Sequence, residues 1–283
     1  MNLLHATDYG SLALVAAAML GTGLISGFVA GLFAVTGSVV RVPILLVAGG
    51  LLGVPPEIRM HVAIATSLAT ALPTLSAAAY AHVRAGNVDW SIWRWYAPGG
   101  LIGAVVGTSL AFLMPSDAIE IVYIVLLLPI AIVALARPQG LHLLKTAPLN
   151  LLGTAMEAVI GFASALIALG GGVFNVMLFG GCGLPKDRVV GTSAAIAPAI
   201  VGPALVVVII GGIGVTGLPS GRFGYVNIFG FVFITIGALI AAPLGALLNK
   251  HVGERRHHLF YGLFVLAVSV NMVVHLLWKS GVF

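Results

Sequence analysis

The fold is decided by a stretch that occurs twice, as Phe33-Ala34-Val35-Thr36-Gly37-Ser38-Val39-Val40-Arg41-Val42-Pro43 and as Ile167-Ala168-Leu169-Gly170-Gly171-Gly172-Val173-Phe174-Asn175-Val176-Met177. Each copy follows a long apolar segment and precedes a short one. Unpaired backbone groups are costly in hydrocarbon, so such a break survives only where protein or a water-filled cavity surrounds it. Paired breaks in the two halves of a membrane protein indicate a transporter's binding site. The alternative is that the glycines only allow helices to pack closely.

The composition predicts a membrane protein. The chain has 283 residues, of which 60% are hydrophobic and 7% are charged, whereas a soluble domain carries about 25% charged residues. Repeated apolar runs of about 20 residues are typical of a polytopic helical membrane protein. The net charge of +5 does not indicate nucleic-acid binding, because the basic residues lie mostly in short loops, where they set orientation. The single cysteine, Cys182, leaves no disulfide framework or Cys-rich metal site, and we expect no cofactor.

We predict an all-α polytopic membrane protein with ten helical segments. They cover about residues 11–34, 38–52, 57–84, 90–114, 116–136, 146–169, 172–181, 185–213, 226–248 and 254–278. We divide the chain into a first membrane repeat (1–136), a cytoplasmic linker (137–145) and a second membrane repeat (146–283). Together these form one integral membrane domain.

The two halves match beyond the breaks, which indicates an internal duplication. The matching positions are Thr66-Ser67 with Thr192-Ser193, the turn 84–89 with the turn 222–227, Gly107 with Gly245, and Tyr123 with Tyr261. Each half then holds five segments. Because five is odd, halves in which every segment crosses the membrane are inverted relative to each other.

The distribution of basic residues tests this topology. If all ten segments cross, nine basic residues share one side: Arg84, Arg94, Arg137, Lys145, Lys186, Arg188, Lys250, Arg255 and Arg256. The other side then holds Arg59, Arg222 and Lys279. If the two short segments are re-entrant, the basic residues divide evenly. The positive-inside rule therefore favours two inverted five-helix repeats with both termini in the periplasm.

These features together resemble the TauE/SafE sulfite exporter family: the Gly-rich break, the short helix with Pro43, the Thr-Ser pairs, the Gly-Val-Asp/Asn turns and the duplication. The resemblance covers nearly the whole chain. It implies a multi-pass carrier of the bacterial inner membrane for sulfite, sulfonates such as sulfoacetate, thiosulfate or related organosulfur anions. The second break matches the family pattern closely. The first has Thr36 and Ser38 where glycine is usual and Arg41 where an apolar residue is common.

The candidate site lies where the short helices begin. Helix N-termini carry partial positive charge and free N–H donors, which suit oxyanions. Ser38 and Arg41 share a helix face, as do Gly172 and Asn175. The predicted substrate-binding residues are Thr36, Gly37, Ser38, Arg41, Thr66, Ser67, Gly170, Gly171, Gly172, Asn175, Thr192 and Ser193. For the Thr-Ser pairs, hydrogen bonding to their own helix is the alternative.

Two charged residues fall inside predicted helices. Arg41 is placed well inside a spanning segment, where a charge is rare and usually functional, although it could also snorkel or bind a carbonyl. Glu157 lies near the middle of the sixth segment. It could carry a coupling proton, pair with Arg41 or serve as a structural hydrogen-bonding group.

We therefore expect a secondary transporter of a small sulfur oxyanion that exports sulfite or a sulfonate by alternating access. Its expected partners are the anion and the lipid bilayer. Uptake of the same anions is the alternative within transport. A membrane-embedded enzyme is disfavoured, because the sequence has no nucleophile elbow and no HExxH motif.

Overall fold

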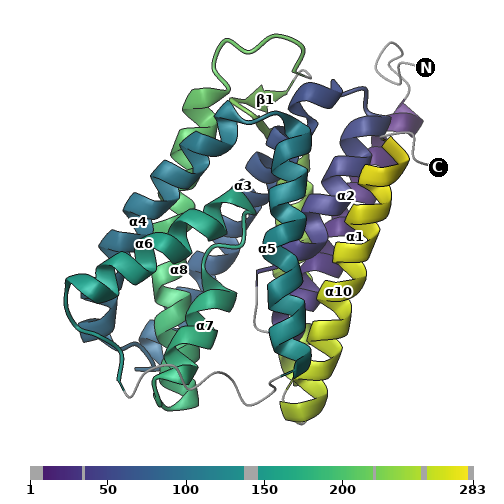
Figure 1. Ribbon diagram of the computed structural model, residues 1–283. Coiled ribbons are helices and arrows are strands. Elements are labelled where there is room, and N and C mark those ends of the chain that lie inside the picture. The colour runs from purple at the N-terminus through teal and green to yellow at the C-terminus, as the bar shows by residue number, and fades with distance from the viewer. Residues whose placement is uncertain (1–8, 34–35, 137–145, 219–220, 250–253, 280–283) are drawn as a thin grey trace.

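The computed structural model describes residues 9–33, 36–136, 146–218, 221–249 and 254–279. The helices are α1 (Tyr9–Phe33), α2 (Ser38–Leu51), α3 (Pro56–Arg84), α4 (Trp90–Leu113), α5 (Ser116–Ala136), α6 (Leu151–Leu166), α7 (Gly172–Gly181), α8 (Lys186–Gly211), α9 (Ile228–Asn249) and α10 (Glu254–Lys279). Two short strands, β1 (Arg222–Phe223) and β2 (Val226–Asn227), form an antiparallel hairpin before α9. The predicted all-α class is confirmed (Figure 1).

Seven of the described helices are long and apolar enough to cross a membrane, and α2, α6 and α7 are shorter apolar helices. The predicted start of the sixth segment, near residue 146, is about one turn too early. Asn150 caps α6 instead, because its side-chain oxygen accepts a hydrogen bond of 3.0 Å from the Leu152 N–H. The β1–β2 hairpin was not predicted, because two-residue strands are too short to show alternation.

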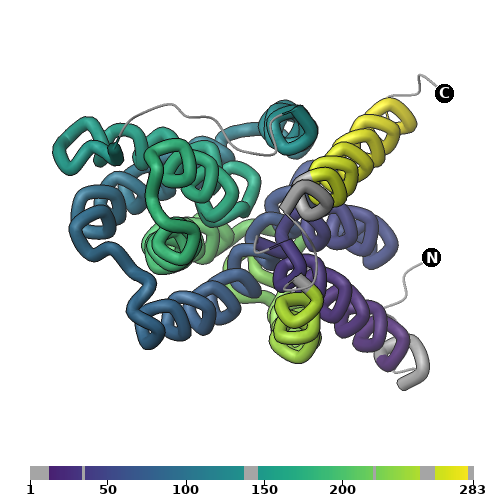
Figure 2. Tube along the Cα trace, turned by 90° about the horizontal axis from the view of Figure 1, so that it is seen from below, coloured from purple at the N-terminus to yellow at the C-terminus, as the bar shows by residue number. Residues whose placement is uncertain are grey.

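The two halves interlock through equivalent helix pairs. α1 of the first half packs against α9 of the second, and α6 of the second packs against α4 of the first. The central pairs join each helix to its own counterpart, α3 with α8 and α5 with α10. Figure 1 shows α5 and α10 both running along the height of the molecule, nearest each other where α5 ends and α10 begins, and Figure 2 shows the α4–α6 group and the α1–α9 group at opposite sides.

Glycine residues allow the helix backbones to approach closely in both the α4–α6 pair and the α1–α9 pair. A Cβ added at Gly99 of α4 would lie 2.0 Å from the carbonyl oxygen of Thr154 in α6, and one added at Gly237 of α9 would lie 2.4 Å from that of Leu20 in α1. The two contacts are equivalent, because Gly237 is the counterpart of Gly99 and Thr154 that of Leu20. Glycine is required at both positions, since any side chain would force the helices apart.

Helix directions bear on the predicted inversion. The start of α5 meets the end of α10, where Asp117 pairs with Lys279 and Glu120 with His275. These counterpart helices are therefore antiparallel, as expected for halves that run in opposite directions. α1 begins and α10 ends at the same end of the molecule (Figure 1). The inverted repeat stays a prediction, which these contacts favour.

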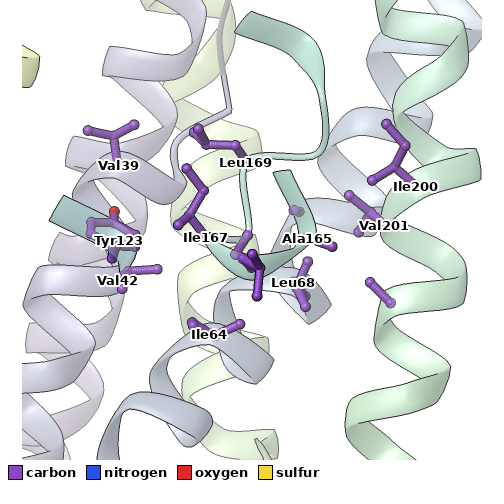
Figure 3. Close-up of a cluster of buried hydrophobic side chains, with 14 of the residues drawn as sticks. Val39, Val42, Ile64, Leu68, Tyr123, Ala165, Ile167, Leu169, Ile200 and Val201 are labelled. Carbon is purple, nitrogen blue, oxygen red and sulfur yellow. The ribbon is translucent and has the colours of Figure 1, made fainter. Parts of the chain in front are cut away.

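The buried core surrounds the second break. Figure 3 shows Ile167 and Leu169 in the chain between α6 and α7, between Val42 and Tyr123 on one side and Ile200 and Val201 on the other. The packing supplies the protein environment that a broken helix needs in hydrocarbon.

Candidate functional site

The second break is a short length of strained backbone. Ala168, Gly170 and Gly171 have φ values of 55°, 64° and 79°. This left-handed region suits glycine and is uncommon for alanine, so Ala168 is a true outlier. The reversal lets α6 end at Leu166 and lets α7 begin at Gly172 in a new direction.

The two breaks touch each other. The Thr36 hydroxyl donates a hydrogen bond of 2.6 Å to the carbonyl oxygen of Leu169. A Cβ added at Gly170 would lie 3.5 Å from Cγ2 of Thr36. Residues 133 positions apart are thus in direct contact, and the two halves of the predicted site meet in one buried region.

The first half of this region gathers polar groups around the start of α2. The Ser38 hydroxyl lies 3.3 Å from Oγ1 of Thr36, and the Tyr123 hydroxyl donates to the Ser38 carbonyl over 3.4 Å. Nε of Arg41 donates to Oγ of Ser67 over 3.4 Å. The α2 helix begins at Ser38, and the N–H groups of Ser38 and Val39 at its start have no partner within the helix. Every one of these side chains is buried.

Arg41 is the main charge of this half. Its side chain is 2% exposed, so snorkelling to the membrane surface is excluded for this conformation. Among the described residues, the ion pairs join Lys279 to Asp117 and His275 to Glu120, and Arg41 takes part in neither. A buried guanidinium without a carboxylate partner is costly unless another anion compensates it.

The second half of the region gathers around the start of α7. Nδ2 of Asn175 donates to Oε1 of Glu157 over 2.9 Å, so Glu157 pairs with Asn175. Oε2 of Glu157 and Oδ1 of Asn175 are buried and have no hydrogen-bond partner in the described part of the chain. Each of these two side chains thus keeps one buried acceptor that a proton or a donor group would satisfy.

The glycines of the second break differ in the room around them. A Cβ at Gly171 would lie 2.4 Å from Cδ1 of Ile200 and 3.3 Å from Nδ2 of Asn175. A Cβ at Gly172 would meet no described atom within 4 Å. The hydroxyl of Ser193 donates to the Gly172 carbonyl over 3.1 Å. The start of α7 therefore has open space at the Cβ position of Gly172.

Thr66 and Thr192 have a different environment from their serine neighbours. Oγ1 of Thr192 accepts a hydrogen bond of 2.9 Å from the Asp89 N–H, and Oγ1 of Thr66 accepts one of 3.1 Å from the Asn227 N–H. Each threonine thus holds the turn of the opposite half. These hydrogen bonds run between the halves, whereas the expected alternative was a bond within the residue's own helix. An anion-binding role for either threonine stays a prediction.

Sequence reasoning missed two features of this region. Tyr123 touches the start of α2, and its match with Tyr261 was noted only as part of the duplication. The buried Glu120 pairs with His275 across α5 and α10. A carboxylate inside an apolar segment was the available signal. The surface hollow of about 310 Å³ lined by Trp90, Ser91, Trp93 and Arg94 lies at the start of α4, away from the breaks.

Seven long apolar helices, two broken segments that meet inside the protein and polar groups gathered at the breaks define a multi-pass membrane transporter. Comparison with known proteins agrees. The family described as "Sulfite exporter TauE/SafE" matches residues 19–272, and the chain belongs to this family.

Curated relatives carry compatible names. A "Probable membrane transporter protein" of Haemophilus influenzae is 26% identical over 255 residues, which cover 88% of this chain and 95% of the relative. Proteins with the same name from two strains of Xylella fastidiosa, Temecula1 and 9a5c, are each 24% identical over 269 residues, covering 92% of this chain and 94% of each relative. No solved structure shows significant similarity to the chain.

Proposed function

We propose that the protein carries a small sulfur oxyanion, with export of sulfite or of a sulfonate such as sulfoacetate as its function. The observation that carries this proposal is Arg41, which is fully buried in the first turn of α2, directly after the first break, and has no carboxylate partner among the described residues. A sulfonate group offers three acceptor oxygens. The guanidinium can bind two of them at once, and the N-termini of α2 and α7 and the hydroxyls of Ser38 and Ser67 supply further donors.

The anion is proposed to bind between the two breaks. Gly172 leaves open space beside the start of α7, and Gly171 turns the chain so that α7 begins at the site. Gly37 and Gly170 allow the breaks to pack closely, against the Ser26 carbonyl and the Val201 side chain respectively. Thr36 and Ser193 hold the breaks through carbonyl groups, so they position the donors. In this proposal no bond of the anion changes, and the relatives' names as transporters favour transport over an enzymatic reaction.

Glu157 is proposed as the group that couples transport to protons. Burial disfavours an ionised carboxylate, and the orphaned Oε2 leaves a position for a proton. Its counterpart by position is Gly23, so only one half holds this group. Such asymmetry suits a coupling group better than a repeated scaffold residue.

Alternating access is proposed to move the two inverted halves relative to each other in the bacterial inner membrane, with both termini in the periplasm. The antiparallel packing of α5 with α10 supports this arrangement. Residues 1–136 and 146–283 would then be the repeats, with the linker 137–145 in the cytoplasm.

Ligand-induced thermal stabilisation tests the proposal. The purified full chain would be heated with sulfite, sulfoacetate, taurine, sulfate or thiosulfate. We expect sulfite or a sulfonate to raise the unfolding temperature, with the increase growing with ligand concentration. If none of the five shifts the unfolding temperature, the sulfur-oxyanion assignment is wrong.

A further inference from the structure

A buried acid–base pair lies outside the anion site, at the contact between the two halves. Oε1 of Glu120 in α5 lies 2.8 Å from Nδ1 of His275 in α10. The Glu120 side chain is 2% exposed and the His275 side chain is 31% exposed. The pair thus joins a buried carboxylate to a partly exposed imidazole near the end of α10.

This pair belongs to a row of polar groups that leads to the start of α2. Asp117, Glu120 and Tyr123 are spaced three apart on α5, so they share one helix face. Asp117 pairs with Lys279 near the helix start, Glu120 pairs with His275 one turn deeper, and Tyr123 donates to the Ser38 carbonyl one turn deeper again.

Other titratable and charged groups lie on the neighbouring elements. Glu57 and Arg59 lie at the start of α3, where Arg59 donates to the Val54 carbonyl. On α3, the His61 ring packs on Phe112 and Tyr225, with ring centroids 5.2 and 5.5 Å away. On α2, Arg41 lies beyond Tyr123, bonded to Ser67. On α6, Glu157 is bonded to Asn175. Within about one turn of the pair along α5 and α10 lie Asp117, Tyr123 and Lys279.

We propose that Glu120 and His275 form a second proton-binding site, which controls the anion site through Tyr123. The proton site stands independently of the proposed function, and only its control of the anion site rests on that function. With the proton bound, the imidazolium balances the buried carboxylate and holds α5 against α10. When the proton leaves, a neutral imidazole and a buried negative charge remain, which is costly in this environment. The contact between α5 and α10 then loosens at this end, and Tyr123 no longer holds the start of α2.

The pH dependence of stability tests the proton site without any anion. The ligand-free full chain would be unfolded at pH values from about 5 to about 8. The ion pair exists only while a proton is bound at the imidazole, so its contribution to stability is present at low pH and is lost once the proton has left. We expect the unfolding temperature of the ligand-free full chain to fall by roughly 2–4 °C across this range. His275→Gln and Glu120→Gln should each remove this component.

His82→Gln is the matched control. His82 is also partly exposed, but its ring nitrogen faces the side-chain amide of Asn87, 3.4 Å away, so it has no carboxylate to balance. We expect this variant to keep the parent's dependence on pH.

Transport in vesicles tests the link to the anion site, with sulfoacetate as the probe and the pH varied only on the side where α5 begins. Its sulfonate stays ionised over this range, so the probe does not titrate there as sulfite does. We expect His275→Gln to transport sulfoacetate without the parent's dependence on that pH. A parental stability slope in His275→Gln overturns the proton site. If His275→Gln loses the pH dependence of the unfolding temperature but keeps the parent's pH dependence of transport, the link through Tyr123 is wrong. If sulfoacetate is not transported by the parent while the stability slope is confirmed, the proposed function fails and the proton site stands.

Discussion

Replacing Arg41 with methionine should stabilise the protein in the absence of anion and should lower its affinity for the anion. The guanidinium is 2% exposed, and its described side-chain contact is one hydrogen bond of 3.4 Å to Ser67. Replacing buried charges with apolar side chains of similar volume often stabilises a protein, by about 1–4 kcal/mol. Loss of the Ser67 hydrogen bond costs about 1 kcal/mol in return. We therefore expect Arg41→Met to unfold at a higher temperature than the parent when no anion is present.

The effect on binding has the opposite sign. A charge-assisted hydrogen bond contributes about 1.5–3 kcal/mol, so Arg41→Met and Arg41→Ala should each lower the affinity for the anion by more than about tenfold. At an anion concentration of about 100 times the parent's Kd, the parent gains about 2.7 kcal/mol of stability, whereas a tenfold weaker variant gains about 1.4 kcal/mol. Arg41→Lys should recover only part of the loss, because lysine lacks the planar fork.

The assay is a thermal unfolding curve at several anion concentrations. Arg59→Met is the matched control, since Arg59 donates to the Val54 carbonyl at 3.0 and 3.3 Å, away from the breaks. It should keep the parent's anion-induced shift. If Arg41→Met unfolds at a lower temperature and keeps the full anion-induced shift, Arg41 is a structural residue and the reasoning fails.

Further predictions concern the second break, coupling, the contact between halves and topology. Gly171→Leu should abolish anion binding, because the side chain would collide with Ile200; Gly172→Ala, with open space around it, should fold and is the control. Glu157→Gln should bind the anion but lose transport driven by a proton gradient; a gradient response equal to the parent's would return Glu157 to a structural role. Thr192→Val should lower the unfolding temperature by removing the acceptor of the Asp89 N–H, by an amount equivalent to about 1–3 kcal/mol. A cysteine placed in the linker 137–145 should resist labelling by an impermeant reagent in intact cells, and strong labelling would contradict the inverted topology.

The sequence by itself determined the class and the positions of most elements. Apolar runs interrupted by Gly170-Gly171-Gly172 and by Gly37 predict helices broken inside a membrane, because backbone groups must be paired there whatever the neighbouring helices are. Composition and periodicity act locally, so α2, α5 and α7 begin at the predicted residues. The buried positions of Arg41 and Glu157 also followed from local sequence, since both lie inside apolar segments.

Only the tertiary structure decided which groups meet. Sequence reasoning allowed Glu157 to pair with Arg41. In the structure, Glu157 accepts a hydrogen bond from Asn175, and Arg41 donates one to Ser67. Thr66 and Thr192 could equally bond within their own helices, and the interlocking of the halves gives them backbone N–H groups from the opposite half. The Glu120–His275 pair joins residues 155 positions apart. Such partners depend on how helices pack, and helix packing is set by the shapes of whole surfaces such as the glycine contacts between α4 and α6, which no single stretch of sequence contains.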